Sequence, residues 1–193
     1  MCSSDLAISM EDELTGLPNA RFFKKELENA FTMAKRYGHV FTVGFIDIDR
    51  FKSINDKFGH LTGNDVLREA AKRMESALRK PDLLTRYGGD EFCMIVREAD
   101  HDRAAVALDR LKKRVEGNLY EGHENKETFP VSISVGMVTC DDKITSLDEL
   151  MELADKSMYR SKKENTGSRP HPVGKRPARK ARKARAGRPR RSV

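Results

Sequence analysis

The spacing of apolar residues changes between helical and strand periods several times along this chain of 193 residues. Residues 40–49, VFTVGFIDID, are rich in β-branched and aromatic residues, which is typical of a strand, and they end in carboxylates. Helical spacing precedes this strand at 18–38 and follows it at 64–78. Further along, the pattern predicts strands at 82–87 and 92–96, a helix at 102–116, a strand at 130–139 and a helix at 146–165. This alternation predicts an α/β domain with helices packed on a sheet.

The same spacing predicts which helix residues face the core. They are Phe23, Leu27, Ala30, Phe31 and Ala34 in the first helix, Val66, Leu67, Ala70, Ala71 and Met74 in the second, and Ala105, Leu108, Leu111 and Val115 in the third.

Charge divides the chain into two parts. Residues 169–193 hold 11 Lys and Arg, four Pro and no Asp or Glu, whereas residues 1–168 carry 26 basic and 30 acidic residues. The formal net charge of +7 therefore belongs to a tail, and the rest is mildly acidic. We expect a leader over 1–11 that ends an upstream linker, a domain over 12–167 and a disordered basic tail over 168–193. The tail is either a solvated appendage or a contact to nucleic acid, and it does not by itself indicate a DNA-binding protein.

No feature of the sequence indicates a membrane span or a secretory signal. The chain lacks a run of about 18 apolar residues, and its N-terminus lacks a basic segment followed by an apolar one. The cysteines, Cys2, Cys93 and Cys140, are far apart and have no metal-ligand spacing. A disulfide framework is therefore not expected, and the composition fits a cytoplasmic protein.

Residues 86–95, RYGGDEFCMI, place two glycines and two carboxylates between two strand-like segments. Glycine adopts positive φ without a Cβ penalty, so Gly88-Gly89 predicts a β-hairpin turn with Asp90 and Glu91 at or just after it. A solvated polar turn is one explanation of these acids. A ligand site is the other, because the strand at 41–48 also ends in acids, Asp47 and Asp49.

Convergence of the two acidic strand ends predicts a metal site. Asp47 and Asp49 share one face of their strand while Ile48 points the other way. If this strand lies beside the hairpin, Asp47 and Asp90 can approach one Mg²⁺, which prefers carboxylate oxygens, water and substrate phosphates. Two such ions about 4 Å apart activate an attacking hydroxyl and stabilise a leaving pyrophosphate. A bend in the segment RFKSINDKFGH would offer backbone N–H groups to a phosphate, and Lys52 in this segment would add a positive charge. Lys162 would add a second charge from across the cleft. Either lysine alone also fits a solvated surface.

Five blocks in a fixed order identify a resemblance. They are DELTGLPN, FIDIDRFKSINDKFGHLTGNDVL, RYGGDEF, SISVGM and ADKSMYRSK, and they cover about residues 12–167. With these blocks the chain resembles the GGDEF-domain diguanylate cyclases. The resemblance implies a palm-like α/β fold with a central, mainly antiparallel sheet, and an enzyme that joins two GTP into cyclic di-GMP and releases pyrophosphate. It also implies two Mg²⁺ or Mn²⁺ ions per site, catalysis by a homodimer and control by an upstream sensory domain.

The resemblance assigns roles to individual positions. Asp47, the Ile48 carbonyl and Asp90 match the metal ligands, and Asp90 also matches the group that helps deprotonate the 3′-hydroxyl, with Glu91 required beside it. The remaining matches are Phe51, Lys52 and Lys162 for phosphate, Asn55 for guanine, and Gly88 and Gly89 for close approach of the nucleotide.

A product-inhibition site is implied as well. Arg79-Lys80-Pro81-Asp82 is an RxxD motif, and five residues separate it from Gly88, which is the family's spacing. Arg110 falls where an additional product-binding arginine is found, and the planar guanidinium suits phosphate and guanine edges. We expect cyclic di-GMP to bind here and to inhibit the chain.

Two positions depart from the family pattern. Asn64 stands where an aspartate normally accepts hydrogen bonds from guanine, and its amide could pair with adenine instead, which predicts acceptance of ATP and formation of cyclic GMP-AMP. Alternatively, Asn64 caps the helix, and Asp65 or Asn55 preserves guanine selection. The second departure is Thr166, which replaces a phosphate-binding arginine and predicts weaker triphosphate binding, unless Lys163 or Arg169 substitutes. A non-catalytic receptor of cyclic dinucleotides is a further alternative, which the presence of Asp47, Asp90 and Glu91 disfavours.

Overall fold

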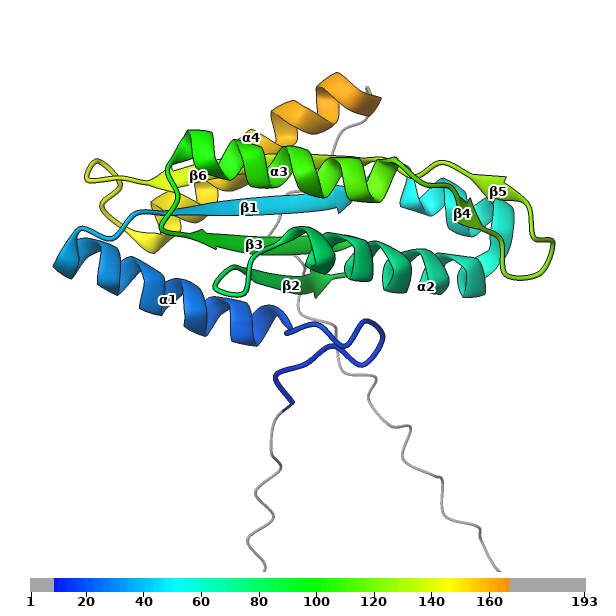
Figure 1. The fold of residues 1–193 in the computed structure, drawn as a ribbon, viewed down its shortest axis with the longest axis horizontal. Coiled ribbons are helices and arrows are strands. Elements are labelled where there is room, and N and C mark those ends of the chain that lie inside the picture. Colours follow the sequence, from blue (N-terminus) through cyan, green and yellow to red (C-terminus); the bar gives the residue numbers. More distant parts are fainter. Residues whose placement is uncertain (1–8, 167–193) are drawn as a thin grey trace, which may run out of the picture.

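Four antiparallel strands form the central sheet of the computed structural model, which describes residues 9–166 (Figure 1). Their order is β2 (Leu83–Gly88), β3 (Glu91–Arg97), β1 (Phe41–Ile48) and β6 (Ile133–Cys140). The two strands expected to carry the acids, β1 and β3, are the inner pair. A separate pair of short strands, β4 (Tyr120–Glu121) and β5 (Thr128–Phe129), lies in the connection before β6. The predicted α/β fold with a mainly antiparallel sheet is confirmed.

Helices cover both faces of this sheet. On one face, α2 (Phe51–Ala77) and α3 (His101–Glu116) pack with Ile46 and Ile48 of β1. On the other face, α1 (Ala20–Tyr37) and α4 (Leu147–Thr166) pack with Val43 and Phe45. Alternate residues of β1 therefore enter different apolar clusters, as strand geometry requires. Asp47 belongs to the face that α4 covers.

Local signals explain the boundaries of α1. The Asn19 side chain accepts hydrogen bonds from the backbone N–H groups of Arg21 and Phe22, which satisfies two free donors of the first turn. Gly38 ends the helix with a φ of 72°, a left-handed conformation that favours glycine. The predicted span of 18–38 therefore agrees with the structure within two residues at either end.

The second helix, predicted from about Asn64, begins earlier in the structure and is preceded by a helical segment that was not predicted. The helix α2 begins at Phe51 and continues to Ala77, with one non-helical residue, Gly59, at a φ of 82° and a ψ of 162°. Residues 50–60 are mostly polar, so their helical spacing is weak, although Ile54 and Phe58 lie one turn apart and pack against the core. The bend expected in this segment is thus a short helical segment, residues 51–58, followed by a break at Gly59.

The apolar stripes of the helices agree with prediction apart from one shift. All five residues predicted to be buried in α2 are buried. In α3, Leu111 and Val115 are buried as predicted, but Ala104 and Ala107 are buried instead of Ala105 and Leu108, which are partly exposed. The sequence offers apolar residues on both sides of this helix, so spacing alone did not choose between them.

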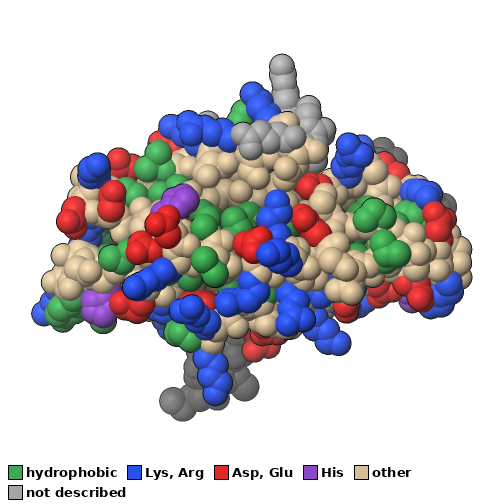
Figure 2. Space-filling view, turned by 45° about the horizontal axis from the view of Figure 1, so that its top comes forward, with side chains coloured by type: hydrophobic (Ala, Val, Ile, Leu, Met, Phe, Trp, Pro, Cys, Tyr) green, Lys and Arg blue, Asp and Glu red, His purple; other side chains and the backbone are tan. Residues whose placement is uncertain are grey.

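Charged side chains of both signs are mixed over the face shown in Figure 2, and hydrophobic side chains form only small islands there. Within residues 9–166, no helix is long and apolar enough to cross a membrane. Cys93 and Cys140 are buried and unpaired. Most of the leader and the basic tail lie outside the described residues.

Candidate active site

The inner strands bring the acids of two distant segments together. Asp47 lies opposite Glu91 in the antiparallel register of β1 and β3. The backbone N–H of Ile48 donates a hydrogen bond of 3.2 Å to the Asp90 carbonyl oxygen, so the turn at 88–90 is fixed against the end of β1. The neighbourhood of strand 41–48 and the hairpin, expected from the sequence, is confirmed.

Asp47 is a buried carboxylate with one satisfied oxygen. The residue is 4% exposed, and its Oδ2 lies 2.6 Å from Nζ of Lys162. Its Oδ1 is also buried and has no hydrogen-bond partner. Burial raises the pKa of Asp47 to about 6 against the opposing effect of Lys162, and the charges of Asp90 and Glu91 raise it further. The ammonium group of Lys162 therefore does not offset the effects of burial and of the neighbouring carboxylates on Asp47.

The residues at this corner fit a divalent cation. A buried carboxylate oxygen without a donor is a ready ligand, and carboxylates of neighbouring strands are the oxygens that Mg²⁺ prefers. Within residues 9–166, no three His, Cys, Asp or Glu side chains form a complete metal cluster. An ion here would consequently take further ligands from backbone carbonyls, water or a bound phosphate.

Asp49 has a different environment from Asp47, although both are buried on one face. Its Oδ2 accepts a hydrogen bond of 2.7 Å from Ser132, and its Oδ1 accepts one of 2.6 Å from Ser134. Asn165, near the end of α4, donates to the Ser134 hydroxyl at 3.3 Å. Asp49 therefore links β1, β6 and α4, and this network was not predicted.

The glycine turn is held by an arginine that the sequence analysis did not single out. Arg86 donates to the Gly89 carbonyl from Nε at 3.1 Å and from Nη2 at 2.8 Å. Its Nη1 contacts both carboxylate oxygens of Asp12, at 2.9 and 3.1 Å. Gly89 has a φ of 60°, which favours glycine at this point of the turn. Both partners belong to recognisable blocks, DELTG and RYGGDEF, but their pairing across 74 residues left no local signal.

The first turn of α2 lies directly after β1 and its acids. Arg50, the N-cap residue, makes no side-chain capping hydrogen bond, so the first backbone N–H groups of the helix have no side-chain cap. Such groups, together with the helix dipole, attract anions. Lys52 is exposed on this turn, and Phe51 is partly buried. The geometry suits a phosphate group.

Asn55 and Asn64 lie on either side of the break at Gly59 and are both partly buried. Gly63 has no space for a side chain, because a Cβ there would lie 1.9 Å from Oδ1 of Asn55. The Asn55 amide thus occupies the place that a larger residue at 63 would take. The structure brings Asn55 into contact with the turn that carries Asn64.

Arg79, Asp82 and Arg110 gather at the opposite end of the β2–β3 hairpin from the glycines. Asp82 accepts hydrogen bonds from the backbone N–H groups of Arg79, at 3.1 Å, and Arg97, at 3.3 Å. Arg110 donates from Nε to the carbonyl of Ala77, the last residue of α2. The exposed Arg79 side chain and Arg110 therefore border the same end of α2, separate from the acidic corner.

The end of α4 supplies part of the expected phosphate site. Lys162 reaches Asp47, as described above. Nζ of Lys163 lies over the ring of Tyr159 at 4.5 Å from its centroid. The side chain of Thr166, and Arg169, lie outside what the structure describes.

Comparison with known proteins was consistent at the levels of family, sequence and fold. The family described as "Diguanylate cyclase, GGDEF domain" matches residues 9–168. Diguanylate cyclase DgcP of Escherichia coli K12 is 32% identical over 158 residues, which are 82% of this chain and 46% of that protein. Response regulator PleD of Caulobacter vibrioides is 35% identical over 157 residues, which are 81% of this chain and 35% of that protein. The chain thus spans less than half the length of these relatives.

A solved structure has the same fold over most of the chain. The GGDEF domain of DgcB from Caulobacter crescentus, crystallised in complex with c-di-GMP, superposes with a TM-score of 0.77 at 30% identity. The match covers 81% of this chain and 92% of that one. Family, sequence and fold agree over the segment that carries the acidic corner, and the chain belongs to the GGDEF family of diguanylate cyclases.

Proposed function

We propose that this chain condenses two GTP molecules into cyclic di-GMP with release of two pyrophosphates, as a homodimer in which each subunit holds one GTP. The observation that carries the proposal is the acidic corner, where the unpartnered Oδ1 of Asp47 lies beside the strand pair that bears Asp90 and Glu91. Retention of these acids supports an enzyme over a receptor that only binds cyclic dinucleotides.

The residues divide the work between binding and proton transfer. The uncapped first turn of α2 with Lys52 binds the triphosphate, and Lys162 adds a second positive charge from α4. Gly88 and Gly89 let the nucleotide approach the turn. Asp90 accepts the proton of the 3′-hydroxyl of one GTP while the hydroxyl oxygen attacks the α-phosphorus of the facing GTP. The bond between this α-phosphorus and the oxygen that bridges it to the β-phosphorus then breaks, and pyrophosphate leaves. Two Mg²⁺ ions held by Asp47, the Ile48 carbonyl and Asp90 would neutralise charge on the attacking and leaving oxygens.

Product analysis tests both the reaction and the base choice. Concentrated protein is incubated with Mg²⁺ and GTP, ATP or an equimolar mixture, and the cyclic products are separated. We expect cyclic di-GMP from GTP. Because the Asn64 amide offers guanine one acceptor where a carboxylate offers two, N64D should raise the preference for GTP over ATP by about tenfold.

Each outcome of this experiment has a meaning. A substantial cyclic GMP-AMP fraction from the mixture, lost in N64D, would make the chain a mixed-dinucleotide synthase with Asn64 as its specificity residue. An unchanged ratio in N64D would leave Asn64 a structural role only. Absence of any product, combined with retained binding of cyclic di-GMP, would replace the enzyme by the receptor.

The contact between Gly63 and Asn55 yields a second prediction. In G63A the new Cβ would meet Oδ1 of Asn55 at 1.9 Å, so the Asn55 side chain must turn away while the helix remains. We expect KM for GTP to rise about tenfold, through loss of one base contact, with little change in melting temperature because alanine favours the helix. Steady-state kinetics of G63A, N55A and the double variant measure this. Additive effects in the double variant would contradict a shared mechanism.

Product inhibition through the RxxD motif yields a third prediction. Cyclic di-GMP should inhibit the chain, and R79A and R110A should each weaken its binding at least about tenfold because each removes a charged phosphate or guanine contact. Titration calorimetry and inhibition assays provide the measurement. R114A, an exposed arginine on the same helix as Arg110, serves as the control. Equal inhibition of R79A, R110A and R114A would exclude this site.

A further inference from the structure

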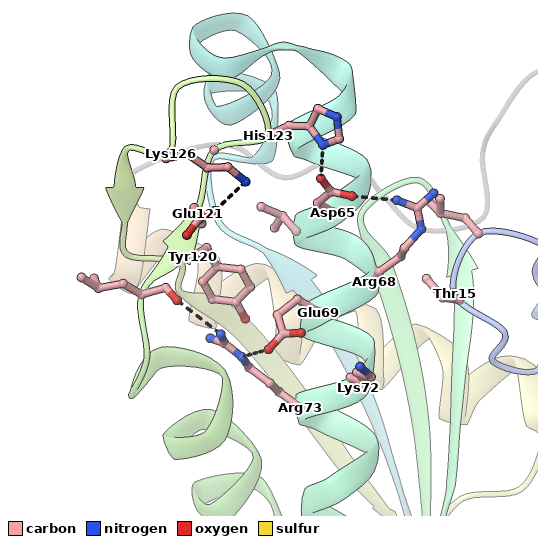
Figure 3. Close-up of a pocket in the computed structure, with 14 residues that line it drawn as sticks. Thr15, Asp65, Arg68, Glu69, Lys72, Arg73, Tyr120, Glu121, His123 and Lys126 are labelled. Carbon is pink, nitrogen blue, oxygen red and sulfur yellow. Dashed lines mark hydrogen bonds and ion pairs between the residues drawn. The ribbon is translucent and has the colours of Figure 1, made fainter.

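A cavity that contains none of Asp47, Asp49, Asp90 and Glu91 lies beside α2 (Figure 3). Its volume is about 610 Å³. One wall is the face of α2 between Asp65 and Arg73, a second is the segment 119–126 before and after β4, and the edge is formed by Leu14 and Thr15. This size suits a mononucleotide or a similar small organic molecule.

The lining carries an excess of positive charge. It contains four Lys and Arg side chains and three acids, together with His123. Each acid lies within 2.8 Å of a cationic partner in the pairs Asp65–Arg68, Glu69–Arg73 and Glu121–Lys126, and Asp65 also contacts His123 at 2.6 Å. Lys72, by contrast, has no hydrogen bond or ion pair with any described residue. An anion entering the cavity would therefore meet one uncompensated ammonium group rather than a carboxylate.

The floor of the cavity is formed by Tyr120 beneath Arg73. Tyr120 is 3% exposed, and its hydroxyl is buried without a hydrogen-bond partner among the described residues. Burial raises the pKa of Tyr120 to about 12, so this hydroxyl keeps its proton. Arg73 covers the ring at 4.0 Å and is held by Glu69 and by the carbonyls of Val115, Asn118 and Leu119. Tyr120 is thus closed off beneath Arg73 and supports the cavity from below.

We propose that this cavity binds a small organic phosphate, such as a nucleoside monophosphate, at a site separate from the GTP site. Lys72 and Arg68 contact the phosphate at the open side, and the body of the ligand covers the exposed side chain of Leu119. Three features support this assignment together: the volume, the unpaired lysine and the exposed apolar side chain of Leu119.

Occupancy of the cavity would act on the turn that carries Asn64. Asp65 lines the cavity and directly follows Asn64, and the backbone N–H of His123 donates to the Thr62 hydroxyl at 3.0 Å. A ligand that fixes the segment 119–126 against α2 therefore also fixes residues 62–65. Binding of a phosphate ester in the cavity therefore changes the affinity of the chain for GTP. This change rests on the proposed function, whereas binding of the phosphate ester does not.

A titration of the full chain with adenosine 5′-monophosphate, without Mg²⁺ or GTP, tests the site by backbone amide NMR shifts. We expect saturable shifts centred on 65–73 and 119–126. Inorganic phosphate should bind more weakly, because it leaves the apolar surface uncovered. K72E should weaken binding of the monophosphate at least about tenfold by reversing the unpaired charge, whereas K25E, the same change at an exposed lysine of α1, should not.

Several results would overturn the proposal. They are shifts centred on 51–55 or 88–91, equal weakening by K72E and K25E, equal affinity for inorganic phosphate, or no saturation at millimolar concentration. The binding experiment needs no catalysis, so its failure is distinguishable from failure of the cyclase assay. In an active preparation, a change in KM for GTP on addition of the monophosphate that K72E abolishes would support the coupling, and an identical change in K72E would exclude it.

Discussion

D47N should lower the rate of cyclic di-GMP formation at least about 10³-fold, because it removes the buried negative charge that attracts the metal ions. Without these ions, the negative charge on the attacking and leaving oxygens is not stabilised. The fold should survive the change. Burial already raises the pKa of Asp47 to about 6, which means that the native state stabilises the neutral form relative to water. Initial rates at saturating GTP and Mg²⁺ measure the effect, and thermal unfolding tests the fold.

D56N is the matched control for this experiment. Asp56 is an exposed aspartate on α2, near the site in sequence but outside the acidic corner. Its replacement should leave the rate within about twofold, as expected for a surface change. A D47N enzyme that retains more than a tenth of the activity would refute the role proposed for Asp47.

G136A should be the most destabilising of the changes considered. A Cβ on Gly136 of β6 would lie 2.0 Å from the backbone nitrogen of Met158 and 2.5 Å from its Cα. These are backbone atoms of α4, so the clash cannot be relieved by turning a side chain, and the helix must move off the sheet. We expect a loss of about 2–4 kcal/mol in the free energy of unfolding, or roughly 5–15 °C in melting temperature.

G44A is the matched control for G136A. Gly44 lies in β1, which is also in the sheet, but its new Cβ would meet the side chain of Met94, at 2.5 Å from Cε. Cγ of Met94 would also lie 2.8 Å away, but all the close atoms belong to one flexible side chain and none to the backbone, so the loss should be smaller than in G136A. Thermal unfolding of both variants measures the difference, and equal losses would contradict the explanation.

Much of the fold was predictable because apolar spacing is a local property. The alternation in 40–49 placed Asp47 and Ile48 on opposite faces, and the structure agrees. The start of α2 was missed because residues 50–60 contact the core through only a few side chains, which is too weak a pattern to reveal a helix. The short strands β4 and β5, of two residues each, are below the length at which spacing carries information.

The residues of the candidate site were more predictable from the sequence than the hydrogen bonds and ion pairs between them. The sequence predicts Asp47, Asp90 and Lys162 as site residues by type and position, and these roles stay predictions. The ion pair of Lys162 with Asp47 and the pairing of Ser132 and Ser134 with Asp49 depend on how α4 and β6 lie against β1. Such contacts join residues more than 80 positions apart, and no pattern along the chain encodes them.

Arg86 couples the loop before α1 to the glycine turn. The Arg86 guanidinium pairs with the Asp12 carboxylate and donates hydrogen bonds to the Gly89 carbonyl, and the Arg86 side chain is only 12% exposed. The backbone reinforces this contact, since the N–H of Arg86 donates to the Pro18 carbonyl at 2.9 Å. The loop at 11–19 and the acidic turn at 88–90 consequently form one mechanical unit. A displacement of the loop at 11–19 would therefore be passed to the acidic turn through Arg86, which also belongs to the edge strand β2.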